Sequence, residues 1–538
     1  MNNVFVPYIK GEKDFSVRFN NLIKEIKNDS TITIEKGEYY LDSQINVIGK
    51  DNLIFDCQDG VVFLAKFDRT NGGKVPTKSI NAFYFENCNN IIFNGSIVKA
   101  DCPTNVRGKI IKVNHEEDYV DIEVYPESPL PGDVEFIGGM TFDENRIPTS
   151  GAMATHKKKD YRYSTYKDER IIVCDELVTT NPPSPTVITD RLSENVFRFH
   201  GIMNMHVHKE GLDCTLYHAY YGVSAFVFRN TTNVTIDGVK IHRYGGMGFL
   251  VLTRCMNFTF KNVIFDNPDK EHSWTSTQSD AIHTLGLGGY LNLENIYFDA
   301  TCDDCLNVHS QILTVSEIDE NKYKVIYNKK KGIVSKTWAK KGDKLYVYNP
   351  ENLVIKGEAV VNSFENGYLT LTEDSYNLSV GDMITNCAYM PEVKIVNCTV
   401  HKCVGQFKIK SCVKALVKNC KFYSEGRAVN VSTFIPTLEG GPVQNVIIEE
   451  NEFNYSLKHA PIFVGFIKDF SEYTNDYTRK DVPIIKNVTI RNNVFNKISC
   501  NELMRIACCD GALIENNKYV DCTAQKIAIY NSENVTIK

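Results

Sequence analysis

Three aspartates in two neighbouring segments have the types and spacing for acid–base chemistry. Asp280 lies in SDAIH, and Asp303 and Asp304 lie in DDCLNVHS. Adjacent residues of a strand point to opposite faces, and a buried unpaired carboxylate is costly. We therefore predict that Asp303 and Asp304 occupy a corner between strands, with both side chains pointing outward. Repulsion among three neighbouring carboxylates raises at least one pKa, which provides an acid and a base in one site.

This arrangement suits glycoside hydrolysis, in which one carboxylic acid protonates the leaving oxygen while a carboxylate activates water. Room for that water predicts carboxyl separations of about 6.5–9.5 Å. Asp280 stands alone on its segment, so we assign it as the general acid. Asp303 and Asp304 would share the base role, although an acid within this pair is the alternative assignment.

Polar residues that follow the carboxylates are candidates for binding a substrate. When the repeated segments are aligned by their turn residues, Asp304 falls beside Asp280. Because stacked strands lie about 4.8 Å apart, four polar residues would then form one outward row beside the carboxylates; they are His283, Asn307, Lys408 and Asn430. The competing interpretation is structural, because asparagine ladders stabilise solenoid turns and an outer lysine is usually solvated.

Two further residues are candidates for contacts to a sugar. His309 follows the second aspartate segment, and Trp274 lies in the loop EHSWTSTQS that precedes Asp280. An indole ring suits stacking on a sugar, so Trp274 is expected to bind substrate. A surface histidine with ordinary partners is the alternative for His309.

A repeat of short strands positions these residues. Each unit has a strand of β-branched and apolar residues, an Asn or Gly turn and a second short strand, as in NVTIDGVKI, NFTFKNVIF and NVTIRNNVF. The turn residues are Gly238, Asn262, Asn295, Asn397, Asn419, Asn451, Asn493 and Asn517, and three of the intervals are 24, 22 and 24 residues. Asn and Gly tolerate a left-handed backbone at a sharp corner. Such a period without helical patterning predicts an all-β, right-handed parallel β-helix of the pectate-lyase type.

Two long gaps interrupt the repeat, and both contain alternating strand patterns that favour small inserted β-barrels. The expected organisation has five parts: an N-terminal cap with a helix near residues 15–27 and the first coils, 1–102; an inserted barrel, 103–200; central coils with the site, 201–310; a second inserted barrel, 311–388; and C-terminal coils, 389–538. The coil of Asn397 is therefore expected to stack directly on the coil of Asn295.

Composition excludes several functional classes. The chain has 538 residues and a formal net charge of -6, and it lacks a basic block with interleaved aromatics, so no nucleic-acid partner is expected. No segment is apolar enough to span a membrane, so no membrane association is expected. The start MNNVFVPYIKGEKDF has no signal-peptide core, which predicts either a cytoplasmic protein or one whose leader has been removed.

The segments HRYGGMGF, SDAIH, DDCLNVHS and EGGPVQNVIIEENEF resemble glycoside hydrolase family 110 over most of the chain. Its members are inverting α-1,3-galactosidases that act on blood-group-B-type and related glycans. The resemblance implies exo removal of terminal galactose, catalysis by Asp280, Asp303 and Asp304, and contact of Glu439 with galactose. It also implies that no metal or other cofactor is needed. The expected partner is a galactose-terminated oligosaccharide or glycan, and a homodimer is left open.

Two rival functions are kept. A pectin-type polygalacturonase shares the solenoid and the aspartate cluster, but this chain lacks a Gly-His-Gly coil. Only Lys408-Ile409-Lys410 approximates the Arg-Ile-Lys coil of those enzymes. A non-enzymatic glycan-binding solenoid is the second rival, and it would have no reason to place three carboxylates together.

Overall fold

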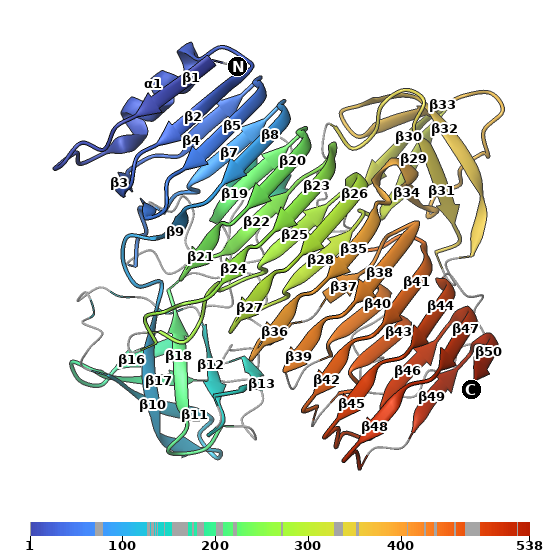
Figure 1. The fold of residues 1–538 in the computed structure, drawn as a ribbon. Coiled ribbons are helices and arrows are strands. Elements are labelled where there is room, and N and C mark those ends of the chain that lie inside the picture. Colours follow the sequence, from blue (N-terminus) through green and yellow to red (C-terminus); the bar gives the residue numbers. More distant parts are fainter. Residues whose placement is uncertain are drawn as a thin grey trace.

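Three long parallel sheets wind along the protein as a solenoid (Figure 1). One sheet has 13 strands, from β1 (Asn2–Val6) to β50 (Glu533–Ile537), and the other two have 11 strands each. The computed structural model describes residues 2–538 apart from 70–78, 126–129, 131–133, 135, 137, 145, 153–170, 175–176, 180–187, 201–207, 219–222, 271–272, 328–336, 351–353, 406, 424–426, 435–437, 457–458, 468–484 and 524–525.

Each complete coil contributes one strand to each of the three sheets. The coil of Asn295, for example, consists of β26 (Leu287–Glu294), β27 (Tyr297–Asp299) and β28 (Leu306–His309). Neighbouring coils pair in parallel, and parallel crossovers of this kind are right-handed in nearly all proteins. The prediction of a right-handed parallel β-helix is confirmed.

The N-terminal end of the solenoid is covered by helix α1 (Phe15–Glu25), close to the expected range. Asp14 caps the helix by accepting a hydrogen bond from the backbone N–H of Ser16, which satisfies one of the free donors of the first turn. Phe15, Phe19 and Ile23 point into the core of the solenoid, so the helix shields the apolar edge of the first coil.

The sheet that carries the site is formed by the third strand of each coil. Its strands, in order, are β4 (Ile45–Ile48), β7 (Phe83–Glu86), β19 (Ser224–Arg229), β22 (Met247–Val251), β25 (Ile282–Leu285), β28, β37 (Phe407–Ile409), β40 (Val429–Phe434), β43 (Ile462–Ile467), β46 (Met504–Ala507) and β49 (Ile527–Tyr530). The third sheet runs from β3 (Gly37–Leu41) to β48 (Lys518–Val520).

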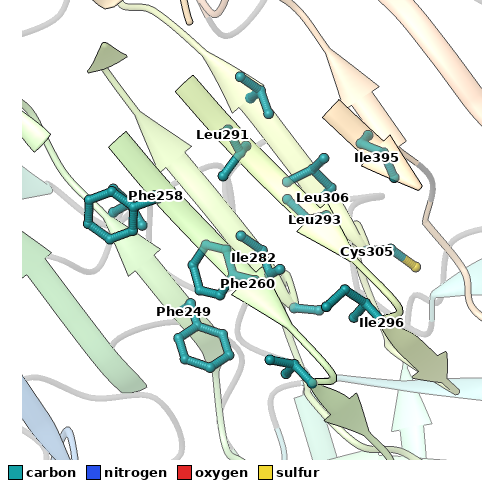
Figure 2. Close-up of a cluster of buried hydrophobic side chains, with 14 of the residues drawn as sticks. Phe249, Phe258, Phe260, Ile282, Leu291, Leu293, Ile296, Cys305, Leu306 and Ile395 are labelled. Carbon is teal, nitrogen blue, oxygen red and sulfur yellow. The ribbon is translucent and has the colours of Figure 1, made fainter. Parts of the chain in front are cut away.

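Inward side chains of successive coils stack into one continuous apolar core (Figure 2). Phe249, Ile282 and Leu306 occupy matching positions on β22, β25 and β28, and all three are fully buried. Burying each such side chain contributes about 1.5–3 kcal/mol. Because side chains alternate along a strand, this inward row forces the next residue of each strand outward.

Sharp corners of the coils use left-handed residues, as expected. Positive φ angles occur at Gly238, Asn262, Asn295, Asn397 and Asn419. These positions place two short strands of one coil on different sheets without a long loop, which keeps the coil compact.

The predicted corners of the last three coils are wrong by one residue. There the positive φ angles fall at Glu450, Asn492 and Asn516. The next residue of each coil, Asn451, Asn493 or Asn517, joins a ladder in which Nδ2 of Asn451 donates to Oδ1 of Asn493 and Nδ2 of Asn493 donates to Oδ1 of Asn517, both at 3.0 Å. At these three positions asparagine therefore acts through its side-chain amide, while the preceding residue has the left-handed backbone.

The first insertion leaves the solenoid after β9 (Ile97–Ala100), and the solenoid resumes at β19. Its main sheet has seven strands in the order β13-β12-β18-β10-β11-β17-β16. Their bounds are β10 (Asn105–Asn114), β11 (Tyr119–Val124), β12 (Gly138–Phe142), β13 (Pro148–Ala152), β16 (Ile188–Arg191), β17 (Val196–His200) and β18 (Asp213–Tyr217). The sheet therefore extends beyond residue 200. β8 (Asn89–Asn94) pairs directly with β20 (Thr232–Asp237), so the insertion is looped out between stacked coils.

The second insertion is a closed barrel in the order β29-β30-β33-β32-β31-β34. Its strands are β29 (Leu313–Asp319), β30 (Lys322–Ile326), β31 (Lys344–Tyr348), β32 (Ile355–Glu365), β33 (Tyr368–Leu371) and β34 (Met383–Asn386). Strands that precede the barrel in the sequence pair with strands that follow it: β26 pairs with β35 (Glu392–Val396), and β27 pairs with β36 (Thr399–His401). The Asn397 coil thus stacks directly on the Asn295 coil, as predicted.

Candidate active site

The three aspartates meet at one corner of the solenoid. Asp303 and Asp304 lie in the turn between β27 and β28, and Asp280 precedes β25 of the coil before. The N–H of Asp304 donates to Oδ1 of Asp280 at 3.2 Å. Each carboxylate has one oxygen within 4.8 Å of an oxygen of the other two. Asp280 and Asp304 are each only 3% exposed, while Asp303 is half-buried.

Close backbone packing holds the Asp303–Asp304 turn. The N–H of Gly405, in the following coil, donates to the carbonyl oxygen of Asp303 at 3.1 Å. A Cβ atom on Gly405 would lie 2.3 Å from that oxygen and 2.3 Å from Cα of Asp304. Only glycine fits there, so the position of the aspartate pair depends on this glycine.

The loop before Asp280 is held by the first insertion. Nδ2 of Asn105, at the start of β10, donates to Oγ1 of Thr275 at 2.7 Å. Nε2 of Gln278 donates to the carbonyl oxygen of Thr104. The inserted sheet therefore fixes the backbone that delivers Asp280 to the corner.

The expected outward row is present in the strand register. His283 pairs with Asn307, Asn307 with Lys408, and Lys408 with Asn430. The structure thus brings these four side chains onto one face, beside the carboxylates. Oδ1 of Asn307 and both amide atoms of Asn430 are buried without a hydrogen-bond partner in the described part of the chain. These asparagines therefore differ from the paired asparagines of the turn ladders.

A second outward row contains the predicted residue His309 and also Lys410, which sequence reasoning did not select. His309 lies opposite Leu285, two positions after Asn307. Lys410, two positions after Lys408, is buried and forms an ion pair with Glu439. Lys410 could have been predicted from the sequence, because residues two apart on a strand point to the same face. The pairing of Lys410 with Glu439 could not be predicted, because it depends on Glu439 lying beside Phe434, where each backbone N–H donates to the other's carbonyl oxygen.

Charges at the corner are unevenly distributed. Burial raises the pKa of Asp304 to about 7, and the carboxylates of Asp303 and Asp280 act in the same direction. The ammonium of Lys408, whose Nζ lies 2.7 Å from Oδ2 of Asp304, opposes this rise. Burial also raises the pKa of Glu439, but the Lys410 ammonium outweighs it and holds that pKa below its ordinary value. Glu439 is therefore ionised, while Asp304 is partly protonated near neutral pH.

Carboxylate oxygens at this spacing could also ligate a cation. Asp304 and Asp280, however, already have basic side chains as partners, Lys408 for the first and His283 for the second. The site thus contains its own counter-charges. The nearest carboxylate oxygens lie within 4.8 Å of one another, since the two coils are hydrogen-bonded neighbours. The predicted separation of the whole carboxyl groups, about 6.5–9.5 Å, stays a prediction.

Trp274 is placed differently from the expectation. It is 3% exposed and packs against Phe142 of the inserted sheet at 5.0 Å between ring centroids. The guanidinium groups of Arg107 and Arg146 lie 4.3 and 5.0 Å from the centre of its ring. The indole therefore joins the first insertion to the loop before Asp280, and this packing takes the place of the predicted stacking on a sugar.

The fold and the corner together define a class: a parallel β-helix protein with three clustered carboxylates at one corner of its coils. No family model matches the chain. The chain is 23% identical over 329 residues to alpha-1,3-galactosidase B of Bacteroides thetaiotaomicron, covering 57% of this chain and 51% of the relative. It is 26% identical over 301 residues to alpha-1,3-galactosidase B of Akkermansia muciniphila, covering 53% of this chain and 37% of the relative.

The chain thus spans about half the length, or less, of these curated relatives. This similarity to proteins named alpha-1,3-galactosidase B confirms the predicted resemblance to α-1,3-galactosidases. Among solved structures, the family 28 exopolygalacturonase of Yersinia enterocolitica is 10% identical, with a TM-score of 0.45, over 99% of this chain and 78% of that one.

Proposed function

We propose that the protein is an exo-acting, inverting glycoside hydrolase that removes terminal α-1,3-linked galactose from glycans. The observation that carries the proposal is the corner of three carboxylates, one of which has a pKa raised to about 7. Similarity to proteins named alpha-1,3-galactosidase B supports the choice of sugar and linkage. A purely glycan-binding solenoid would gain nothing from three carboxylates that repel one another.

Within this site, we assign Asp304 as the general acid. A general acid works best when its pKa lies near the working pH, and Asp304 is the member of the cluster whose pKa burial raises to about 7. Asp280 accepts hydrogen bonds from the Asp304 N–H and from His283, which favours its ionised form. This assignment replaces the sequence-based choice of Asp280 as the acid.

Asp280 and Asp303 would then hold the attacking water. Two acceptors that each lie about 2.8 Å from one water oxygen are separated by roughly 4.5 Å. The three carboxylates have oxygens within 4.8 Å of one another, so one water can donate to two of them at once. Short carboxylate separations in other glycosidases accompany retention, with a carboxylate as nucleophile. The stereochemistry is therefore the sharpest test of the proposal.

Stereochemistry and substrate are tested together. On Galα1,3Gal, we expect proton NMR to show β-galactose first, with α-galactose appearing only by mutarotation. Linear Galα1,3Gal, branched B-type glycan, an aryl α-galactoside and galacturonan are compared in the same series. Galactosides should be cleaved and galacturonan should not, since both lysines of the site are already paired with carboxylates. Early α-galactose would establish retention instead, and cleavage of galacturonan alone would establish the pectinase rival.

Lys408→Met should move the alkaline limb of the pH profile of kcat/KM to higher pH. A general acid must be protonated, so activity falls as pH rises through the pKa of Asp304. Lys408 lowers that pKa, and its removal therefore extends the protonated form upward. Lys418→Met is the matched control, because Lys418 pairs with Glu449 and Glu450 on a different sheet. An alkaline limb that stays in place in Lys408→Met would remove Asp304 from the acid role.

A further inference from the structure

Three residues and a backbone carbonyl form a continuous hydrogen-bonded chain behind the carboxylate corner. Nδ1 of His283 is hydrogen-bonded to Oδ2 of Asp280. Nε2 of His283 lies 3.0 Å from Nε2 of His309, and Nδ1 of His309 lies 3.2 Å from the carbonyl oxygen of Ser310. The two imidazole rings are perpendicular, with an interplanar angle of 89°.

The carbonyl end fixes where the protons lie. A carbonyl oxygen only accepts, so Nδ1 of His309 must carry the proton of that bond. A neutral His309 then has its lone pair on Nε2 and accepts a hydrogen bond from Nε2–H of His283. Nδ1 of His283 and Oδ2 of Asp280 would be two facing lone pairs without a proton between them. The Asp280–His283 pair therefore holds one proton in addition to the proton on Nε2.

We infer that His283 is an imidazolium that keeps Asp280 ionised, and that His309 is a neutral positioning residue that holds His283 in this state. This inference rests on the proposed function, because it assigns a purpose to the ionised form of Asp280. Neither histidine need touch the reacting atoms, so both differ from the expected sugar-binding residues.

The surrounding charges agree with this arrangement. His283 faces Asp280 on its own segment, His309 on β28, Lys410 after β37, and Glu439 on the turn before β41 (Val443–Glu449). Burial lowers the pKa of His283, but the hydrogen bond to Asp280 and the negative charges of Asp280 and Glu439 together outweigh burial, so the pKa is raised overall. Burial lowers the pKa of His309 to about 3, so this ring is neutral at any working pH.

The hydrogen-bonded chain from Asp280 to Ser310 counters the mutual repulsion of the three carboxylates. Three carboxylates with oxygens within 4.8 Å of one another repel one another, which favours protonation of the cluster. Lys408 supplies one positive charge, at Asp304, and His283 supplies the other, at Asp280. At Asp304 burial outweighs the charge of Lys408, whereas His283 favours the ionised form of Asp280, so the acid and the base differ in protonation although their segments are hydrogen-bonded to each other.

Three substitutions separate the effect of the positive charge on His283 from the effect of its hydrogen bonds. His283→Asn keeps a donor near the place of Nδ1 but removes the positive charge beside Asp280. The acidic limb of the kcat/KM profile should then move up by about one to three pH units. His309→Asn keeps the donor to Ser310 but removes the acceptor, and should move the limb less in the same direction. His309→Gln places an amide oxygen near the former Nε2 and should restore the limb.

His401→Asn is the matched control. Nδ1 of His401 is bound to Oδ1 of Asp299 at 2.6 Å, an equivalent histidine–aspartate pair on the neighbouring sheet. Its acidic limb should coincide with that of the unaltered protein. A lower kcat with an unmoved limb in His283→Asn would leave only a structural role and overturn the inference.

A measurement without substrate separates this inference from the proposed function. In protein labelled with 15N-histidine, the His283 signals, assigned by their loss in His283→Asn, should show protons on both ring nitrogens near neutral pH. His309 should show a proton on Nδ1 only. A neutral His283 would overturn the inference even in an active enzyme. Absence of activity on every galactoside, with the same NMR result, would refute the proposed function while the proton assignment stands.

Discussion

Asp304→Asn should lose about 10²–10⁴-fold in kcat on Galα1,3Gal and retain most of its activity on an aryl α-galactoside with a good leaving group. The asparagine amide has the shape of the carboxyl group but no proton to give to the departing oxygen. A phenolate whose conjugate phenol has a low pKa leaves without that proton, so the aryl substrate does not need the missing acid. Steady-state kinetics on both substrates measure the difference.

The same variant should change the pH dependence in a defined way. In the unaltered protein, kcat/KM should fall as pH rises through about 7, where burial places the pKa of Asp304. With Asp304→Asn and the aryl substrate, that alkaline limb should disappear. Gln278→Asn removes a hydrogen bond to the inserted sheet but retains all three aspartates, so it serves as a control for general disturbance of the corner. Equal losses on both substrates would show that Asp304 does not act as the acid.

Asp280→Asn should lose activity on both substrates to a similar extent, with kcat falling by roughly 10²–10⁴-fold. Neither leaving group removes the need for an activated water, and the amide is a poor base. Asp303→Asn should behave in the same way, because Asp280 and Asp303 would hold that water together. Circular dichroism of each variant checks that the solenoid is intact.

Azide separates a missing base from a misfolded site. Azide is a nucleophile that needs no deprotonation, so it should restore turnover of the aryl substrate in Asp280→Asn. The product of an inverting site is β-galactosyl azide, identified by NMR. Azide should leave the rate of Asp304→Asn on the disaccharide unchanged, because that variant lacks the acid. If instead Asp280→Asn spares the aryl substrate and Asp304→Asn does not, the original sequence-based assignment of the acid is correct.

Local sequence determined the coil and its outward face. Asparagine and glycine at positions such as Asn262 and Asn295 take the left-handed backbone that a corner needs, and their spacing sets one coil. Alternation then fixes which side chains point outward. The row from His283 to Asn430 could therefore be predicted from aligned repeats, including the alignment across the inserted barrel.

The tertiary structure decided contacts between segments that no repeat relates. Lys410 contacts Glu439 only because Glu439, which lies outside the repeat, is hydrogen-bonded to Phe434 of the sheet. Trp274 is buried because the first insertion, far away in sequence, places Phe142 against it. Loops and insertions have no fixed period, so sequence spacing carries no information about where they return.

The protonation states of the three carboxylates could not be predicted from the sequence either. Residue types alone identify Asp280, Asp303 and Asp304 as a cluster, but a pKa depends on burial and on the partner of each carboxylate. Lys408 reaches Asp304, and the chain through His283 and His309 reaches Asp280. The sequence by itself thus determined which carboxylates gather at the corner. Only the tertiary structure decided their separation and their charge, because both depend on distances between atoms of different coils.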